Sequence, residues 1–409
     1  MLGIYPAILL FCVTGQFDIN GLVTLEARAG QAPLDTSGQV EWGVIGIATP
    51  DVQLSYLSRT ADVRLDYGPR IFWREPNDTS TLRPLILHVG AFNGTLRATR
   101  RLGLFANATG SVGEADYTAL GQILPGQAAL PAVVDFLSVS STAGMVVQTS
   151  RLSELSNALT FIHRRPLGAA ADVKAMDPTM PPPFPRQTSL SLTSAFKLMA
   201  SRQDEISVSN IVSYGTYSGN VDIFTVVPEA RWRMHLSPRY DLRVGAGIAY
   251  AHVNPALDAW SPVSPVGELG LDMRLSNSAG ASTRASVLAQ VDYFIDPVLS
   301  TAGPRALLTA GWWDVLNPDW QVGVEGMYAT VFTGTNAPVG TTLPDETTVS
   351  LYIPVRHRAS DHVLMEFGFR YADRAPSVEV SAFGFHQRQL WLYYMVTGTT
   401  RRPTSRSVQ

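Results

Sequence analysis

Apolar and polar residues alternate along much of this chain, in segments of about ten residues that are separated by turn-forming residues. In the segment 361–372, Val363, Met365 and Phe367 fall on one side, whereas Glu366 and Arg370 fall on the other. The same alternation recurs in the segments 242–250 and 284–293. Because successive side chains of a β-strand point to opposite faces, each segment is predicted to be a strand with one apolar and one polar face.

Eighteen strands are expected from this alternation, with sixteen as the nearest alternative. The predicted strands cover residues 22–30, 42–58, 61–73, 84–98, 102–112, 132–150, 153–164, 188–200, 205–214, 220–236, 241–253, 266–276, 283–294, 305–316, 319–332, 347–357, 362–372 and 388–398. Such a series fits a soluble sandwich, in which the polar faces meet bulk water. It also fits a transmembrane barrel, in which the apolar faces meet lipid and the polar faces line a lumen.

The connections between the predicted strands favour the barrel. The short connections include residues 58–60, 99–101, 201–204, 237–240 and 317–318, and the long ones are 31–41, 74–83, 113–131, 165–187, 254–265, 333–346 and 373–387. This alternation is typical of outer-membrane barrels, which have short periplasmic turns and long extracellular loops. We therefore predict an all-β protein, a single transmembrane antiparallel up-and-down β-barrel with both termini in the periplasm.

The composition agrees with a barrel and excludes two other classes. Of the 409 residues, 45% are hydrophobic, which is ordinary for a globular protein and too low for a bundle of membrane helices. The longest uncharged stretch, 117–134, contains Gly121, Pro125 and Pro131, and this excludes a spanning helix. The net charge of −3 argues against nucleic acid as a partner.

The two ends of the chain are predicted to lie outside the barrel. Residues 1–15 resemble a secretory signal peptide, although no Lys or Arg precedes the apolar run. Cys12, the only cysteine, lies inside this segment, so the processed protein is expected to have no disulfide and no cysteine-ligated metal. The barrel is then expected to cover residues 16–399, followed by a polar tail at 400–409.

Two local segments carry a resemblance to a known family. They are the turn His-Leu-Ser-Pro-Arg-Tyr-Asp at 235–241 and the aromatic-rich closing strand Gln-Leu-Trp-Leu-Tyr-Tyr-Met-Val at 389–396. With the alternating strands, they make nearly the whole chain resemble a large porin-like outer-membrane β-barrel protein of diderm (Gram-negative) bacteria. The polar tail departs from family members that stop at a terminal aromatic residue. The resemblance implies the bacterial outer membrane as location, with membrane lipid and lipopolysaccharide, the barrel-insertion machinery and a possible periplasmic protein as partners.

Residues predicted to face the lumen are the candidates for function. The pore-lining candidates carry both signs of charge, and they are Arg64, Asp66, Arg231, Arg233, His235, Arg243, Glu268, Asp272, Arg274, Glu366 and Arg370. Opposed charges across a narrow aqueous pore create a field and a size filter. The alternative is that the same charges neutralise each other inside a plugged barrel. Because Glu366 is placed on the wet face, Glu366→Arg is expected to be tolerated far better than Phe367→Arg.

One group of these candidates is predicted to form a wall. Arg231, Arg233, His235 and Arg243 fall on two adjacent antiparallel strands, so their side chains should be neighbours. Their position close to the turn at 237–240 puts them near the periplasmic mouth. We expect an anion-attracting wall, with arginines that face lipid phosphates as the alternative.

Other segments give weaker signals. The proline-rich connection 165–187 cannot join a sheet ladder and is either a constriction at the mouth or a rigid surface loop, and 113–131 is a second candidate for a lid or plug. The tryptophans at 73, 232, 260, 312, 313, 320 and 391 mostly lie near the ends of predicted strands. This placement is typical of aromatic belts at the membrane interface, although aromatic residues also favour strands in general.

Enzymatic function is not expected. The chain contains no Gly-x-Ser-x-Gly elbow, no His-Glu-x-x-His pair, no phosphate-binding loop and no dinucleotide-binding glycine pattern. We predict no catalytic residue, no metal and no cofactor. Two functions remain: a channel for passive or semi-selective passage of small solutes, and the barrel of an envelope export or assembly complex, for example for exopolysaccharide, that is gated by a separate periplasmic protein.

Overall fold

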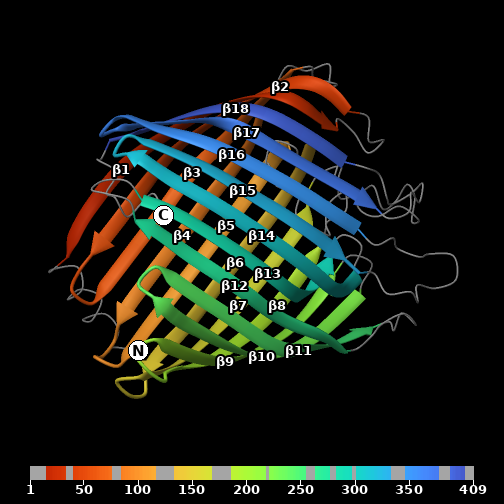
Figure 1. Ribbon diagram of the computed structural model, residues 1–409. Helices are drawn as coiled ribbons and strands as arrows, with labels where there is room; N and C mark the ends of the chain where they lie inside the picture. Colours follow the sequence, from red (N-terminus) through yellow and green to blue (C-terminus); the bar gives the residue numbers. More distant parts are fainter. Residues whose placement is uncertain are drawn as a thin grey trace, which may run out of the picture.

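The protein folds into one closed antiparallel β-barrel of eighteen strands (Figure 1). The computed structural model describes residues 15–33, 40–75, 84–116, 133–167, 186–217, 221–254, 263–276, 282–296, 301–332, 346–376 and 387–400. In this part of the chain there is no helix long and apolar enough to cross a membrane. The strands are β1 (Gln16–Pro33), β2 (Val40–Leu57), β3 (Ala61–Glu75), β4 (Leu85–Arg97), β5 (Leu102–Asp116), β6 (Val133–Gln148), β7 (Ser153–Pro166), β8 (Gln187–Met199), β9 (Asp204–Tyr217), β10 (Val221–Ser237), β11 (Tyr240–Asn254), β12 (Val263–Ser276), β13 (Ser282–Asp296), β14 (Thr301–Asn317), β15 (Trp320–Val331), β16 (Glu346–Ser360), β17 (Val363–Pro376) and β18 (Gln387–Thr399).

The eighteen strands and the up-and-down order confirm the prediction from alternation. Each strand pairs antiparallel with its neighbours in sequence, and β1 pairs with β18 from Leu22 opposite Thr399 to Gln31 opposite Leu390. Thr400 extends this seam, because its backbone N–H donates to the carbonyl oxygen of Gly21 at 3.0 Å. A closed barrel leaves no sheet edge, which is the condition for a β-structure to cross a lipid bilayer. The proposed signal peptide at 1–15 and the tail at 400–409 lie almost entirely outside the described residues.

The connections differ in length between the two ends of the barrel. At one end the connections run from two residues, at 238–239, to five residues, at 277–281. At the other end they reach twenty residues, at 167–186, although 218–220 and 297–300 are short. Both ends of the barrel domain lie on the side of the short turns (Figure 1). In outer-membrane barrels this side faces the periplasm.

The two-residue turns share a local device that the sequence supplies. Before each of the turns 238–239, 318–319 and 361–362 the strand pairing shifts register, at Ser237, Asn317 and Ser360. The side-chain oxygen of each residue accepts a hydrogen bond from a backbone N–H two residues later, at 2.9–3.2 Å. Ser and Asn are suited to this role because their short side chains bond to the nearby backbone.

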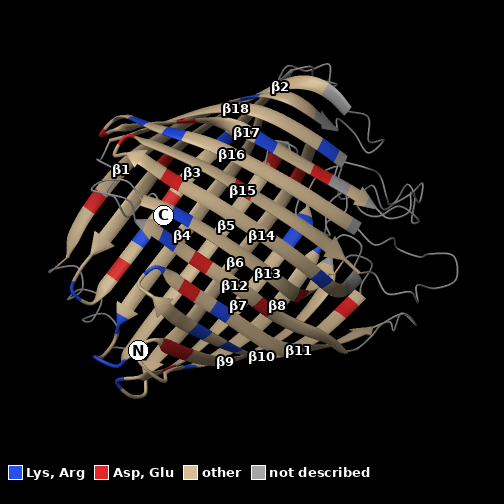
Figure 2. Ribbon diagram, in the orientation of Figure 1, with Lys and Arg blue, Asp and Glu red and all other residues tan. Residues whose placement is uncertain are grey.

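The outer face of the barrel is apolar. Large side chains on this face stay exposed, among them Ile19 at 71%, Val208 at 52% and Leu392 at 64%. Figure 2 shows charged residues as separate bands along the strands and basic residues on several of the short turns. An exposed apolar surface around a closed barrel is the surface that meets lipid. We call the opposite side of the strands the inner face.

Tryptophans on the outer face lie near both ends of the barrel. Trp42 and Trp73 lie near the end with long connections, and Trp232 and Trp312 lie near the short turns, with 39–65% of each side chain exposed. This arrangement matches two aromatic belts at the headgroup level. Trp391 does not fit the belt hypothesis, because it points inward and is only 3% exposed. Trp260 lies outside the described residues.

Candidate functional site in the barrel interior

The structure places all eleven pore-lining candidates on the inner face. The strand pairing shows this directly, since Arg233 lies opposite Arg243 and Asp241 lies opposite both His235 and Asp272. The candidates occupy three regions of the wall: Arg64 and Asp66 on β3, the charged set on β10–β12, and Glu366 with Arg370 on β17. The three regions differ in exposure and in the partners of each charge.

The first region of charge is an ion-paired wall on β10–β12. Arg231 donates from Nε to Oε1 of Glu229 at 2.9 Å and from Nη2 to Oε2 at 2.8 Å. Its Nε also lies 3.7 Å from Oε1 of Glu268 on β12. Arg243 pairs with Asp272, Nη2 to Oδ2, at 3.0 Å. We call these residues, together with the Asp241 group described next, the ion-paired wall.

Asp241 is the centre of the second half of this wall. Its Oδ2 accepts a hydrogen bond from Arg233 at 3.1 Å and lies 3.6 Å from Nη2 of Arg274. Its Oδ1 bonds to Nδ1 of His235. The carboxylate of Asp241 is only 9% exposed, whereas the side chain of Arg274 is 65% exposed. The guanidinium groups therefore reach toward water while the carboxylates stay close to the strands.

These pairings change the interpretation of the wall. The predicted neighbours are indeed neighbours, but the expectation of an anion-attracting surface is wrong in one respect, because Arg231, Arg233 and Arg243 are each bound to a carboxylate. Sequence reasoning missed Glu229 and Asp241. The signal was available, because Glu229 precedes Arg231 by two residues on the same face and Asp241 is the first inner-face residue after the turn.

The region on β2 and β3 is smaller. Asp66 accepts a hydrogen bond from Nε2 of Gln53 on the paired strand, at 2.6 Å from its Oδ1. Arg64 lies opposite Ser55, and its side chain is exposed. Arg64 and Asp66 therefore both face the interior, and the described structure shows no ion pair between them.

The third region surrounds a buried carboxylate on β17. Glu366 is 2% exposed. Its Oε1 accepts hydrogen bonds from the hydroxyl groups of Tyr352 at 2.5 Å and Tyr393 at 2.7 Å, and its Oε2 accepts one from Nε of Arg356 at 2.6 Å. The guanidinium carbon of Arg370 lies 4.5 Å from the ring centre of Tyr393 and 5.0 Å from that of Tyr352. We call this set the buried carboxylate cluster.

The cluster corrects the prediction for Glu366. This residue lies on the inner face but is only 2% exposed, so its carboxylate does not face an aqueous path. Arg370 is half-buried on the same face and is held against two aromatic rings. The network continues to Trp313, whose ring lies 4.4 Å from the guanidinium carbon of Arg356 and whose Nε1 donates to Oε1 of Glu325 at 2.7 Å. Trp313 is thus an interior residue and not part of an outer belt.

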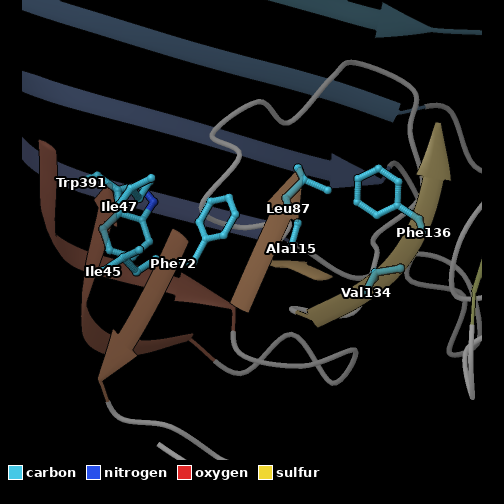
Figure 3. Packing of buried hydrophobic residues seen from close by; sticks show 8 residues of the cluster. All are labelled: Ile45, Ile47, Phe72, Leu87, Ala115, Val134, Phe136 and Trp391. Carbon is cyan, nitrogen blue, oxygen red and sulfur yellow. The ribbon is translucent and has the colours of Figure 1, made fainter. Parts of the chain in front are cut away.

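Part of the inner face is apolar and packed. The cluster comes from six strands and consists of Ile45, Ile47, Phe72, Leu87, Ala115, Val134, Phe136 and Trp391, each at most 9% exposed (Figure 3). Burial to this degree means that the inner face of β2–β6 and β18 is covered by packed side chains near the end with long connections. The inner face is therefore not polar throughout, and the alternation in the sequence does not predict this apolar part.

A neutral polar surface covers the adjoining stretch of the wall, on β5–β9. Its inner-face residues are small and carry hydroxyl or amide groups: Asn107, Thr109, Ser111, Ser138, Ser140, Thr142, Ser156, Thr160, Ser189, Ser191, Thr193, Ser207, Ser209 and Ser213. We call this surface the hydroxyl wall. Within these described strands, inner-face charges such as Lys197 and Glu205, which pair at 2.8 Å, lie near strand ends. Sequence reasoning looked for charge and passed over this uncharged surface.

The described residues hold no group of three or more His, Cys, Asp or Glu side chains that could bind a metal ion. The proline-rich connection 165–187 and the lid candidate 113–131 fall mostly outside the described residues. The candidate site is therefore the interior itself, with a packed side, an ion-paired side and a hydroxyl-lined side.

Comparisons with known proteins agree with the fold. No protein-family model matches the chain, and no curated protein matches it in sequence. The FrpB iron transporter from Neisseria meningitidis (F3-3 variant) matches with a TM-score of 0.53 and 8% identity, over 92% of this chain and 66% of that one. OccAB2 from Acinetobacter baumannii matches with a TM-score of 0.49 and 7% identity, over 94% and 98% of the two chains. OccK2 (OpdF) from Pseudomonas aeruginosa matches with a TM-score of 0.44 and 8% identity, over 93% and 98%.

At such low identity the likeness shows the fold alone. The chain has the closed antiparallel β-barrel fold of the bacterial outer membrane, and its apolar outer face and short turns agree with this location. The fold does not specify what passes through the barrel.

Proposed function

We propose that this protein is an outer-membrane channel for the passive passage of small hydrophilic solutes. The observation that supports this best is the run of polar side chains along two adjoining walls of the interior. The side chains of the hydroxyl wall and the guanidinium groups of the ion-paired wall are exposed or half-buried, whereas the buried apolar side chains of the inner face lie near the end with long connections, Ile45 and Phe72 on one side and Ile223 and Val253 on the other. The proposed aqueous path runs beside these two walls, on β5–β12.

The chemistry of the two walls predicts weak ion selectivity. The small side chains of the hydroxyl wall leave room and offer hydrogen bonds to water and solutes. On the ion-paired wall each arginine is matched by a nearby carboxylate, so the wall has little net field at a distance. Field strength and pore width are the two determinants of selectivity in such channels.

Conductance of the refolded barrel in planar bilayers tests the proposal, with a matched pair of variants on β8. Ser191 lies on the inner face and Leu192, its neighbour, is 45% exposed on the outer face. Ser191→Trp places a large ring in the proposed path and should lower the single-channel conductance. Leu192→Trp places the same ring in lipid and should leave the conductance unchanged.

Two outcomes would contradict the proposal. Equal conductance of the wild type and both variants would show that the conducting path does not run along the hydroxyl wall. A wild-type barrel that inserts and never conducts would reject a passive channel and favour the export or assembly barrel that a periplasmic partner gates.

A further inference from the structure

The outer face carries an apolar groove close to the short-turn end. It crosses the outer face of β1–β5 and has a volume of about 530 Å³. One side is formed by Phe17 on β1 and Tyr56 on β2, whose rings lie 4.8 Å apart, and the other side by Leu96 on β4 and Leu104 on β5. The groove lies on the surface that meets lipid, since Phe17 is 68% exposed and Leu104 is 38% exposed.

Small residues make the floor of the groove. Ala61 and Gly94 lie between the two sides and Ala106 lies beside Gly94 on β5, and a Cβ at Gly94 would come within 2.9 Å of the Phe92 ring. A groove of this size, lined by aromatic and aliphatic side chains on the lipid-facing surface, suits a flexible hydrocarbon chain.

Three arginines lie on the short turns next to the same groove. Arg59 is on the turn between β2 and β3, and Arg100 and Arg101 are on the turn between β4 and β5, all with exposed side chains. The two turns are neighbours, because the backbone N–H of Arg97 donates to the carbonyl oxygen of Thr60 at 2.7 Å. No ion pair joins these three arginines to an acidic residue in the described part of the chain.

Hydrogen bonds within the two turns fix the backbone that carries the arginines. The Oγ of Ser58 accepts the backbone N–H of Ala61 at 2.9 Å, and the Oγ1 of Thr99 accepts those of Arg101 and Leu102 at 3.1 and 3.0 Å. The arginines at the headgroup level match the phosphate of a phospholipid, and the adjoining apolar groove matches one of its acyl chains. Arginine in particular binds phosphate oxygens through its planar fork.

We propose that this groove is a specific site for an anionic phospholipid of the periplasmic leaflet, with one acyl chain in the groove and the phosphate between Arg59, Arg100 and Arg101. The charge of the rim selects an anionic headgroup over a zwitterionic one, because unpaired arginines near a membrane surface attract net negative charge. The site is independent of the aqueous path, since it lies on the opposite side of the strands.

Native mass spectrometry of the folded barrel in nonionic detergent, with added phosphatidylglycerol or phosphatidylcholine, tests the site. The wild type should retain one phosphatidylglycerol more strongly than phosphatidylcholine. The triple variant Arg59→Gln, Arg100→Gln, Arg101→Gln should lose this preference, with affinity for phosphatidylglycerol falling by on the order of tenfold or more. Ala106→Trp fills the floor of the groove and should reduce retention of both lipids.

Matched controls separate a site from general attraction. The control triple variant Arg151→Gln, Arg202→Gln, Arg239→Gln removes the same charge from three other short turns, and Ala246→Trp adds the same ring elsewhere on the outer face. Both controls should retain phosphatidylglycerol as the wild type does. Equal loss in the two triple variants, or unchanged retention in Ala106→Trp, would overturn the proposal. Heat-dependent migration on gels shows that each variant is folded, and the two groove variants test opposite ends of the site independently.

Discussion

The ion-paired wall on β10–β12 and the buried carboxylate cluster on β16–β18 contain the same residue types, but their charged side chains differ in exposure. In the ion-paired wall, the side chains of Arg231 and Arg274 stay 46% and 65% exposed. In the cluster, Glu366 is 2% exposed and accepts three hydrogen bonds. Exposed ion pairs contribute about 0–1 kcal/mol to stability, because water screens them.

Burial therefore decides which charges stabilise the barrel and which are exposed to its interior. Removal of one partner from a buried pair leaves an uncompensated charge and costs about 3–5 kcal/mol. The arginines of the ion-paired wall carry less of that penalty, because their side chains are 35–65% exposed toward the barrel interior. The same comparison overturns the expectation that Glu366→Arg would be tolerated, since that position is as enclosed as a core residue.

The largest effect on stability is expected for Glu366→Gln. The change keeps the shape of the side chain and removes the charge that binds Arg356, so the free energy of unfolding should fall by about 3–5 kcal/mol. Urea-induced unfolding of the barrel in lipid vesicles measures this. Asp272→Asn removes a carboxylate that is 32% exposed and paired with Arg243, and it should cost less than about 1 kcal/mol. Equal losses in the two variants would remove the distinction between the regions.

The next effect tests the two faces of a strand that lies in neither charged region. Val208 on β9 is 52% exposed on the outer face, and the adjacent Ser209 belongs to the hydroxyl wall. Val208→Arg should lower the free energy of unfolding by about 2–4 kcal/mol near the middle of the membrane, whereas Ser209→Arg should leave it nearly unchanged. The same vesicle assay measures both variants. A greater loss for Ser209→Arg would show that the hydroxyl wall is packed and not wet.

The sequence predicted the strands and the face of each side chain, because both follow from a period of two. All eighteen predicted strands overlap the strands of the structure, and the eleven candidates share the inner face. The period does not report whether the interior is filled at a given height. This is why Glu366 and Trp391 were placed wrongly, the first in water and the second in a belt. Pairing across strands was also missed, since the partner of Arg233 comes from the next strand.

The smallest effect on stability, and the most direct test of the lumen, concerns the ion-paired wall. Replacement of Arg231, Arg233 and Arg243 together by Gln should change the free energy of unfolding by no more than about 1 kcal/mol per pair, because these guanidinium groups are exposed and the buried Asp241 keeps His235 and Arg274 as partners. It leaves the carboxylates of this wall, including Asp241 and Asp272, without these cations. Reversal potentials across a salt gradient should then shift toward cation preference.

A complementary variant, in which the carboxylates are removed, tests the direction of the shift in reversal potential. Glu229→Gln, Asp241→Asn and Asp272→Asn together remove the carboxylates and leave the three arginines, so the shift should reverse toward anions. Both shifts should be greatest at low salt, where screening is least. If the two variants moved the reversal potential in the same direction, or if neither moved it, the ion-paired wall would not border the conducting path. The path would then be confined to the hydroxyl wall, and ion selectivity would depend on pore width alone.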